Sequence, residues 1–458
     1  MKVIVCGAGQ VGFNIAKYLA DQHNDVTVID RSSKLIRQIG EQLDVQALEG
    51  FASDPDLLDR ASAGDADMII AVTWADEVNM VACQVAHSLF NVPTKIARVR
   101  NQSYLKPMWQ DLFSRDNMPI DVIISPEVEV ARAVHRRLEV PGAFDMIPFA
   151  DDRIRVLGVM LGESCPVVDT PLRQLTELFP DLHVRVLAII RAGKAFVPSS
   201  DDQMEVGDGI YFAADTHHVS RAMSVFGHDE KEARRIVIVG GGNVGLFLTQ
   251  HLEESSPRTN IKLIERDEDR AAHIADKLSR AVVIHGDALE TEILREANAG
   301  EAETIVAVAN DDEVNILSSL LAKRQGTARA IALLTRQVYT PLVGSLGIDV
   351  HVDPRETTVS TILQHIRRGR IRGLHSIRDG AAEIIDAEVL EASPLAGKTL
   401  QQANLPGGVI VGAILRDNQV LLPRSTTEFE AHDRIILYAT ADAVKKVEQL
   451  FAVRLEFF

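Results

Sequence analysis

The stretch VIVCGAGQVG at residues 3–12 decides the fold, because a short apolar run ends there in three closely spaced glycines. The same pattern returns at residues 236–245 as IVIVGGGNVG. An apolar strand that leads through such glycines into a helix is typical of the loop that holds a dinucleotide pyrophosphate. The glycines are Gly7, Gly9 and Gly12 in the first copy, and Gly240, Gly242 and Gly245 in the second.

In both copies the next apolar run reaches an acidic residue, Asp30 in VTVIDR and Glu265 in IKLIER. These acids follow the last glycine at about the distance that a βαβ unit needs. Such a carboxylate accepts hydrogen bonds from ribose hydroxyls and repels a 2′-phosphate, which favours NAD(H) or an adenine nucleotide over NADP. Arg31 and Arg266 follow directly and weaken that exclusion slightly. An alternative is that both acids only cap the following helix.

The likeness between the halves extends along the chain. DADMIIAVTWADEVN at 65–79 corresponds to EAETIVAVANDDEVN at 301–315. Around these segments, apolar runs alternate with helical patterns, which indicates a parallel sheet covered on both faces. Each such region is followed by short strands around one helix, with turn signals between them, which predicts a small α+β module.

We therefore predict an α/β protein with an internal duplication. Two Rossmann-like domains, each a doubly wound parallel sheet, are each followed by a small α+β domain. The expected boundaries are 1–145 and 146–228 for the first pair of domains, and 235–372 and 373–458 for the second pair.

Composition narrows the classes of function. The chain has 458 residues, 46% of them hydrophobic, and a formal net charge of −17. That charge argues against nucleic acid as a partner, and against docking on an anionic membrane by electrostatics alone. No apolar run reaches the roughly 18 residues of a membrane-spanning helix, and the chain starts directly on a strand, with no signal peptide. Three scattered cysteines predict no disulfide framework, so we expect a cytoplasmic protein.

Residues at the carboxyl ends of strands are the next candidates, because they line the crevice of a doubly wound sheet. Thr73 and Trp74 follow the fourth strand of the first half, and Ala309 and Asn310 follow its counterpart. All four residues are expected to border the nucleotide. The DEVN segment that comes next in both halves is interpreted mainly as a helix N-capping sequence.

The two crevices are expected to differ in charge. The fifth strand of the first half, TKIARVR, ends with Arg98 and Arg100, whereas Leu333 and Thr335 occupy these positions in the second half. Because arginine binds phosphate through forked hydrogen bonds, the first site should tolerate more phosphate charge and bind ATP better. The second site should prefer NAD(H) or be largely structural. The alternative is that both arginines are exposed to solvent.

No catalytic constellation is visible in the sequence. A nicotinamide dehydrogenase needs a domain that brings an acid–base residue to the reacting carbon, and the small modules offer mainly acidic loops and turn glycines. GxSxG, HExxH, the P-loop lysine motif and CxxC do not occur. His135 and His365 lie on matched helices and are interpreted as surface or interface residues. We do not expect an enzyme; the alternative is an NAD-dependent oxidoreductase with an unrecognised active site.

The repeated glycine loops, the segments AVTWADEVN and AVANDDEVN, and the duplicated small module resemble the RCK (or KTN) family of potassium-conductance regulators. The tandem arrangement is similar to the cytosolic regulatory subunits of bacterial Trk potassium uptake systems, over essentially the whole chain. This resemblance implies Rossmann-like domains that bind NAD(H) or ATP/ADP. It also implies a homotetrameric ring that gates an integral membrane potassium channel or transporter subunit, and a location at the inner face of the cell membrane through that partner.

Carried over residue by residue, the resemblance implies two sets of nucleotide-binding residues. The first set is Gly7, Ala8, Gly9, Gln10, Val11, Gly12, Asp30, Thr73, Trp74 and Arg98. The second set is Gly240, Gly241, Gly242, Asn243, Val244, Gly245, Glu265, Ala309 and Asn310. The second set departs from the first where Leu333 replaces Arg98, which argues against equal handling of ATP.

Two matched helical segments, 126–138 and 355–366, follow the last strand of each α/β domain and are apolar on one face. That face exceeds what covering their own sheet requires. We therefore expect both segments to pack across a dimer interface through which the chain self-assembles. A third possible function is a sensor without a membrane partner, in which the small modules bind an ion or a metabolite.

Overall fold

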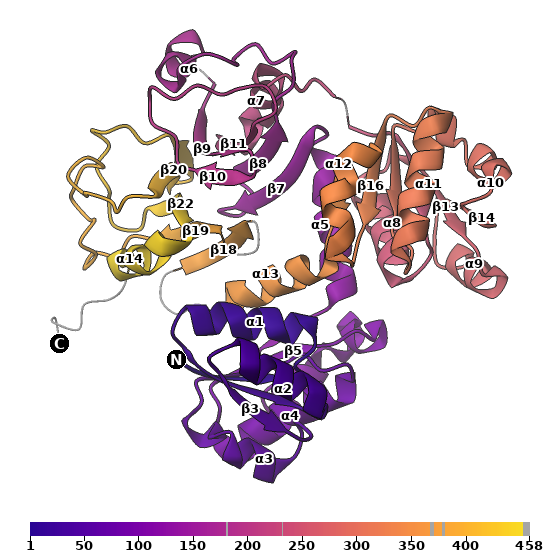
Figure 1. Ribbon diagram of the computed structural model, residues 1–458, viewed down its shortest axis with the longest axis vertical. Coiled ribbons are helices and arrows are strands. Elements are labelled where there is room, and N and C mark those ends of the chain that lie inside the picture. The colour runs from indigo at the N-terminus through magenta and orange to yellow at the C-terminus, as the bar shows by residue number, and fades with distance from the viewer. Residues whose placement is uncertain (180–181, 231, 367–370, 378–380, 452–458) are drawn as a thin grey trace.

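The computed structural model describes residues 1–179, 182–230, 232–366, 371–377 and 381–451. It contains two parallel and two antiparallel sheets, which alternate along the chain. In Figure 1 the first parallel sheet lies at the bottom of the view, the second at the right, and the two antiparallel sheets together at the upper left. Within the described residues, no helix is long and apolar enough to cross a membrane. The predicted fold class, a duplicated α/β chain, is confirmed.

The first half begins with a six-stranded parallel sheet of order β3-β2-β1-β4-β5-β6. Its central strands β1 and β4 are almost continuously buried, because helices cover both faces of the sheet. The strand order reverses between β1 and β4, and a crevice forms beyond their carboxyl ends. The strands are β1 (Lys2–Cys6), β2 (Asp25–Asp30), β3 (Gln46–Glu49), β4 (Met68–Ala71), β5 (Thr94–Arg98) and β6 (Val122–Ile124), and the covering helices are α1 (Gln10–Asp21), α2 (Ser33–Gln42), α3 (Pro55–Arg60) and α4 (Asp76–Phe90).

The second half repeats this sheet in the order β14-β13-β12-β15-β16-β17. The pairing of β12 with β13 and β15 matches that of β1 with β2 and β4, so the second crevice lies at the equivalent strand ends. The strands are β12 (Arg235–Val239), β13 (Asn260–Glu265), β14 (Val282–His285), β15 (Thr304–Ala307), β16 (Arg329–Leu333) and β17 (Val350–Val352). The helices are α8 (Asn243–Ser255), α9 (Glu268–Ala275), α10 (Thr291–Glu296), α11 (Asp312–Gln325) and α12 (Val343–Leu346).

The last helix of each Rossmann-like domain packs on the other domain. Helix α5 (Pro126–Glu139) lies along α8, and its Val130 and Val134 belong to the same buried core as Ile238 of β12. Helix α13 (Pro354–Ile366) lies against both α1 and α5, and its Ile362 shares a core with Ile15 of α1. Figure 1 shows α13 directly above α1 and α5 beside α8. The two halves of the chain therefore exchange helices.

This exchange corrects the expectation that the two helical segments pack across a dimer interface. Their apolar faces are covered within a single chain, so they no longer argue for self-assembly. His135 of α5 is only 8% exposed, because its ring packs edge-on against His251 of α8, with 4.4 Å between ring centroids. It is thus an interface residue between the halves of one chain, whereas His365 is exposed.

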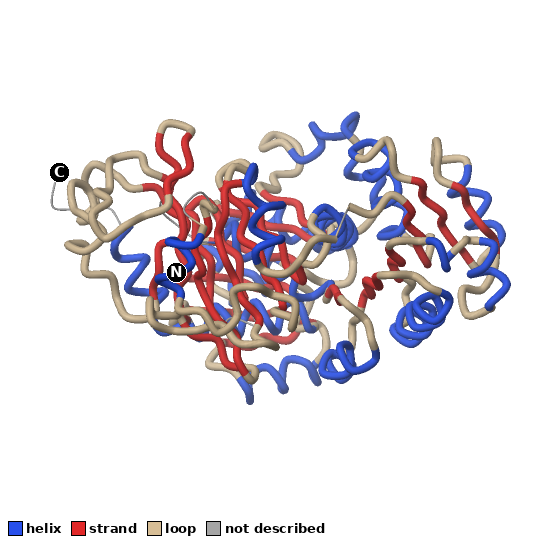
Figure 2. The backbone as a smooth tube through the Cα atoms, turned by 90° about the horizontal axis from the view of Figure 1, so that it is seen from above, coloured by secondary structure: helices blue, strands red, loops and turns tan. Residues whose placement is uncertain are grey.

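The two small modules are antiparallel sheets of equivalent order, β7-β8-β11-β9-β10 and β18-β19-β22-β20-β21. They pack face to face in one core that joins Leu187 and Ala213 to Ile436. Seen from above in Figure 2, a dense group of strands lies to the left of the separate strands at the right of the view. The first sheet comprises β7 (Ala143–Phe149), β8 (Ile154–Met160), β9 (Val184–Arg191), β10 (Lys194–Phe196) and β11 (Gly209–Asp215), with α6 (Leu172–Leu178) and α7 (Val219–Val225). The second comprises β18 (Ile371–Ile377), β19 (Ala382–Glu388), β20 (Val409–Arg416), β21 (Gln419–Leu421) and β22 (Arg434–Thr440), with α14 (Ala441–Phe451).

Candidate functional site

The glycine loop of the first half contains three glycines with different tasks. Gly7 has a φ of +111°, and a Cβ there would lie 3.0 Å from the backbone nitrogen of Thr73. A Cβ on Gly12 would lie 1.8 Å from the carbonyl oxygen of Gly7, so only glycine lets α1 approach β1 this closely. Gly9 has no atom within 4 Å of its Cβ position. Its open side leaves the backbone accessible to a pyrophosphate.

The loop of the second half repeats this division of tasks. Gly240 has a φ of +100°, and a Cβ there would lie 2.7 Å from the backbone nitrogen of Ala309. A Cβ on Gly245 would lie 2.0 Å from the carbonyl oxygen of Gly240, while Gly242 has open space around its Cβ position. Both halves therefore build the same cradle from the same glycine spacing.

The helices that follow these loops present uncompensated N-termini to the crevices. Gly9 and Gly242 are the N-cap residues of α1 and α8, and neither helix has a side-chain cap or an acidic residue in its first turn. The first N–H groups of a helix lack intrahelical partners and carry partial positive charge. Both termini therefore suit an anionic ligand. The first turns contain Gln10 and Val11 in one half, and Asn243 and Val244 in the other.

The two acids bind the glycine loops from the ends of β2 and β13. The backbone N–H of Ala8 donates to Oδ2 of Asp30 at 2.7 Å, and that of Gly241 donates to Oε2 of Glu265 at 2.7 Å. The following helices are capped by other side chains, those of Ser32 and Asp267. The alternative that the acids only cap the following helix is therefore wrong, although their other oxygens accept from the backbone N–H groups of Ser32 and Asp267. Each carboxylate oxygen keeps a lone pair that a ribose hydroxyl can use.

Two buried asparagines, which sequence reasoning did not single out, fix the edges of the crevices. Oδ1 of Asn79 accepts from the backbone N–H of Thr73 at 2.8 Å, and its Nδ2 donates to the Arg98 carbonyl at 2.9 Å. In the second half, Asn315 bonds the Ala309 N–H and the Leu333 carbonyl at 2.8 and 2.9 Å. Each asparagine ties the ends of two adjacent strands together. The signal in the sequence was the repeated DEVN segment.

The structure also corrects the interpretation of DEVN as a capping sequence. The N-cap of α4 is Ala75, without a side-chain cap, and the N-cap of α11 is Asp311, which precedes the segment. The first residue of each segment is buried instead. Asp76 accepts from the backbone N–H groups of Arg100 and Asn101, and Asp312 from those of Thr335 and Arg336. These carboxylates hold the chain that leaves the fifth strand.

The two arginines of the first crevice have different partners. Nη2 of Arg98 donates to the Thr73 carbonyl at 2.7 Å, and its Nε is buried without a hydrogen-bond partner among the described residues. Desolvation, with the nearby charge of Arg100, lowers the pKa of Arg98. Arg100 is ion-paired with Glu127 at 3.0 Å and lies 4.4 Å from the ring centroid of Trp74. Arg98 therefore has donor capacity for a ligand, whereas Arg100 is occupied.

The four residues predicted at the ends of the fourth strands differ in how close they lie to the glycine loops. The backbones of Thr73 and Ala309 are held at the loop by the asparagines, beside Gly7 and Gly240. Trp74 is 79% exposed and Asn310 is also exposed, so the side chains of these two residues lie at the rim.

The second crevice contains an arginine that sequence reasoning missed. Leu333, which occupies the position of Arg98, is buried in the core. In its place, Arg270 of α9 reaches the glycine loop, where its Nε donates to the Gly241 carbonyl at 2.9 Å. The equivalent residue of the first half is Leu35, a partly buried apolar side chain. Arg270 lies three residues after the capping Asp267. Its contact with the glycine loop cannot be seen in the sequence, because only the folded sheet brings the two segments together.

These arrangements fit a phosphate-bearing nucleotide in both crevices. The open Cβ positions of Gly9 and Gly242 leave room at the backbone, the uncapped helices offer N–H groups, and Arg98 Nε is a buried donor without a partner among the described residues. In the part of the chain that the structure describes, no cluster of His, Cys, Asp or Glu could hold a metal ion.

The fold and the two glycine crevices define a class of protein, a tandem of Rossmann-like domains that each precede a small antiparallel module. The family models agree with this division. The TrkA-N domain matches residues 3–126 and 236–354, and the TrkA-C domain matches residues 156–227 and 384–452. The chain belongs to the TrkA family of Trk system potassium uptake proteins. The family predicted from the sequence is thereby confirmed.

Relatives in this family match the chain along its full length. The Trk system potassium uptake protein TrkA of Azorhizobium caulinodans is 54% identical over 458 residues, which cover 100% of both chains. That of Halomonas elongata is 39% identical, again over 100% of both chains. Among solved structures, the RCK domain of GsuK has a TM-score of 0.60 at 18% identity, covering 99% of this chain and 95% of that one. The GsuK channel bound to NAD also has a TM-score of 0.60 at 18% identity, covering 99% and 79%. These two likenesses show the fold.

Proposed function

We propose that this chain is a nucleotide-sensing regulatory subunit that gates a Trk-type membrane potassium subunit. Membership of the TrkA family supports a role in potassium uptake. The observation that carries the sensing role is the pair of uncapped helix N-termini, each facing a glycine loop whose middle glycine is open. A solved relative in fold is a channel with NAD bound, which supports NAD(H) as one ligand.

The residues of each crevice have distinct tasks in this proposal. Gly7 to Gly12 and Gly240 to Gly245 hold the pyrophosphate, while Asp30 and Glu265 accept from ribose hydroxyls. Arg98 adds a donor for the charge of ATP in the first crevice. Bound nucleotides supply charge and no chemistry, and we propose that the chain is not an enzyme.

The exchanged helices explain how a nucleotide can act beyond its own crevice. Helix α1 begins at the first glycine loop and packs on α13, while α8 begins at the second loop and packs on α5. A nucleotide whose phosphates attract either N-terminus therefore moves α1 or α8. The helix packed against it, α13 or α5, belongs to the other half and is displaced with it. A ligand shifts such an equilibrium only by its differential affinity for the two arrangements. NAD(H) and ATP/ADP differ in charge and size, so the two classes of ligand can shift this equilibrium to different extents.

We further propose that four copies assemble into a ring with two crevices per chain. The ring is cytoplasmic and lies at the inner face of the cell membrane, bound to the membrane subunit. The surface that mediates assembly differs from the exchanged helices, whose apolar faces are already covered within the chain.

The proposal is tested with the full chain. Calorimetric titration with NAD, NADH, ATP and ADP should reveal two sites per chain, and incubation with NADH should yield no turnover. Potassium flux through vesicles that contain the Trk membrane subunit should change when the chain and nucleotide are both added. Absence of nucleotide binding, or identical flux with and without nucleotide, would contradict the proposed function.

A further inference from the structure

Helix α1 begins at the first glycine loop and reaches the second small module through a hydrogen bond to a buried carboxylate. The phenol of Tyr18, about two turns into the helix, donates to Oε1 of Glu383 at 2.5 Å. Glu383 lies on β19 and is only 1% exposed. The bond joins residues that are 365 positions apart in the sequence. It therefore connects the helix of the first nucleotide crevice to a module near the other end of the chain.

The packing around this bond opposes movement of α1 relative to β19. Ile15 of α1 and Ile385 of β19 belong to the same buried core, and Tyr18 packs against that core. Because side chains alternate along a strand, Glu383 shares the face of Ile385, whereas Ile384 belongs to the core with the first module. Loss of a hydrogen-bond donor is costly for a buried carboxylate. A shift of α1 that breaks the bond is therefore penalised, unless β19 moves with the helix.

The duplication does not repeat this contact. Counted from the last glycine of each loop, Tyr18 corresponds to His251 on α8. Counted from the matched hairpins β7–β8 and β18–β19, Glu383 corresponds to Arg155 on β8. His251 packs on a histidine of α5, and Arg155 is ion-paired within its own half. The bond between phenol and carboxylate thus belongs to the first crevice and the second module alone.

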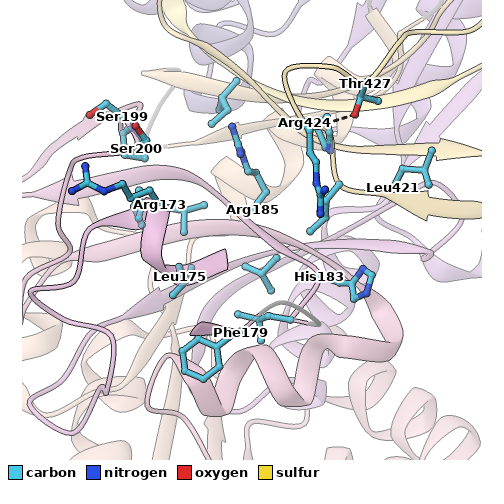
Figure 3. A pocket seen from close by; sticks show the side chains of 18 of the residues that line it. Arg173, Leu175, Phe179, His183, Arg185, Ser199, Ser200, Leu421, Arg424 and Thr427 are labelled. Carbon is cyan, nitrogen blue, oxygen red and sulfur yellow. Dashed lines mark hydrogen bonds between the residues drawn. The ribbon is translucent and has the colours of Figure 1, made fainter. Parts of the chain in front are cut away.

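The second module has room to shift against the first. A cavity of about 510 Å³ lies where the two modules meet. Figure 3 shows Arg185 of the first module and Leu421 and Arg424 of the second around this space. Close-packed side chains resist displacement, and a junction that is partly unfilled resists it less. A small movement of the second module is therefore least opposed along this edge.

We propose that the bond between Tyr18 and Glu383 couples ATP binding in the first crevice to the position of the second small module. This inference rests on the proposed nucleotide binding, and it gives Tyr18 a positioning role without contact to the ligand. Phosphates at the glycine loop hold the N-terminus of α1 where the bond forms, and the bond in turn holds β19. Linkage requires the reverse effect, so loss of the bond weakens ATP binding by the same factor.

Hydrogen exchange of the full chain, with and without saturating ATP, tests this coupling. ATP should slow exchange at residues 3–12, which reports binding to the glycine loop. It should also slow exchange in β19 about fivefold, the lower end of the usual range for coupled sites. In Tyr18→Phe, which removes only the hydroxyl group, protection of the loop should remain and the response of β19 should be lost. Glu383→Gln keeps an acceptor for the phenol and should retain the response.

The matched control is Tyr339→Phe, which removes a bond of the same kind, from a phenol to the Glu313 carboxylate, in the second half. This variant should leave the response of β19 intact. Melting temperatures verify that each variant is folded.

A double-mutant cycle on ATP affinity gives a second measurement, in a Gly245→Ala background that leaves only the first crevice. Tyr18→Phe and Glu383→Met should each weaken ATP binding about fivefold. The double variant should lose no more than either one, because both substitutions remove the same bond. Additive losses would overturn the proposal.

The exchange data separate failure of this coupling from failure of nucleotide binding. A protected glycine loop with unchanged β19 in the unmodified chain, or a response of β19 that persists in Tyr18→Phe, would overturn the coupling alone. If ATP leaves the glycine loop of the unmodified chain unprotected, the proposed function fails, and the coupling fails with it.

Discussion

The two crevices share a backbone and differ in where they hold positive charge. Both have the same glycine cradle, an acid that binds the loop, and a buried asparagine that ties two strand ends. The first has Arg98 at the end of β5, where the second has the buried Leu333. The second has Arg270 on the glycine loop, which Glu265 also binds. Duplication thus preserved the cradle, while the charged side chains beside it diverged.

The largest effect on nucleotide binding is expected from substitutions that place a side chain inside the glycine loop. Gly12→Ala places a methyl group 1.8 Å from the Gly7 carbonyl oxygen, and Gly245→Ala places one 2.0 Å from that of Gly240. Because backbone must move to accept either methyl, each substitution should abolish binding at its own crevice and leave the other unchanged. Calorimetric stoichiometry measures this directly. Loss of both sites in one variant would show that the crevices are not separable.

The contacts of the exchanged helices also differ between the halves. His135 of α5 packs against His251 of α8, whereas His365 of α13 is exposed. Burial, with His251 and Arg136, lowers the pKa of His135 to about 4, although the Glu139 carboxylate lies 3.3 Å from its Nδ1. Burial raises the pKa of Glu139, which weakens it as a counter-charge. An unfolded histidine titrates near 6.5, so the unfolded chain binds more protons between pH 6.5 and pH 4.

Stability should therefore fall as the pH drops through that window, by about 2–3 kcal/mol for this group. Urea unfolding at pH 7 and pH 4.5 measures the change, with His135→Gln as the variant that lacks the titrating ring. An equal loss of stability in the two proteins would remove His135 as the cause.

Removal of the acid that we propose binds the ribose should weaken nucleotide binding at one site. Asp30→Ala is expected to cost about 1.5–3 kcal/mol for NADH and ATP at the first crevice, the loss of one or two charge-assisted hydrogen bonds. Glu265→Ala should have the same effect at the second crevice alone. Because each carboxylate also holds the glycine loop, Asp30→Asn and Glu265→Gln serve as controls of similar shape. Unchanged affinity for both ligands in Asp30→Ala would reject the assignment.

Arg98 should discriminate between ligands more than it affects binding as a whole. Arg98→Ala is expected to weaken ATP binding about tenfold and NADH binding by less, because ATP carries more phosphate charge. Arg100→Ala is the matched control, since that side chain is already paired with Glu127. The reciprocal change Leu333→Arg tests whether the charge is sufficient to transfer the preference. Equal losses for ATP and NADH would show that Arg98 has only a structural role.

The smallest effect is expected at Arg270, whose guanidinium already has one backbone partner. Arg270→Leu, which restores the residue type of Leu35, should change NADH affinity at the second crevice about threefold, the scale of one partly exposed hydrogen bond. Titration in a Gly12→Ala background isolates that crevice. Unchanged NADH affinity in that background would contradict the assignment of Arg270.

The sequence was sufficient for the parts of the fold that rest on local patterns. Glycine spacing and the acid at the end of the second strand predict the cradle around Gly9 and Asp30, because both belong to one βαβ unit. It was not sufficient for the packing partners of α5 and α13, since an apolar helix face does not specify which surface covers it. Arg270 and Asn79 were missed for a related reason: their hydrogen bonds join segments that only the folded sheet brings together.

The central claim, that two nucleotide crevices differ in ligand preference through Arg98, is tested most directly by measuring ATP affinity with one crevice disabled at a time. Gly245→Ala leaves the first crevice, and Gly12→Ala leaves the second. We expect ATP to bind about tenfold more tightly to the chain that carries Gly245→Ala, with the difference removed by adding Arg98→Ala. Equal ATP affinities in the two variants, or tighter binding in Gly12→Ala, would contradict the claim.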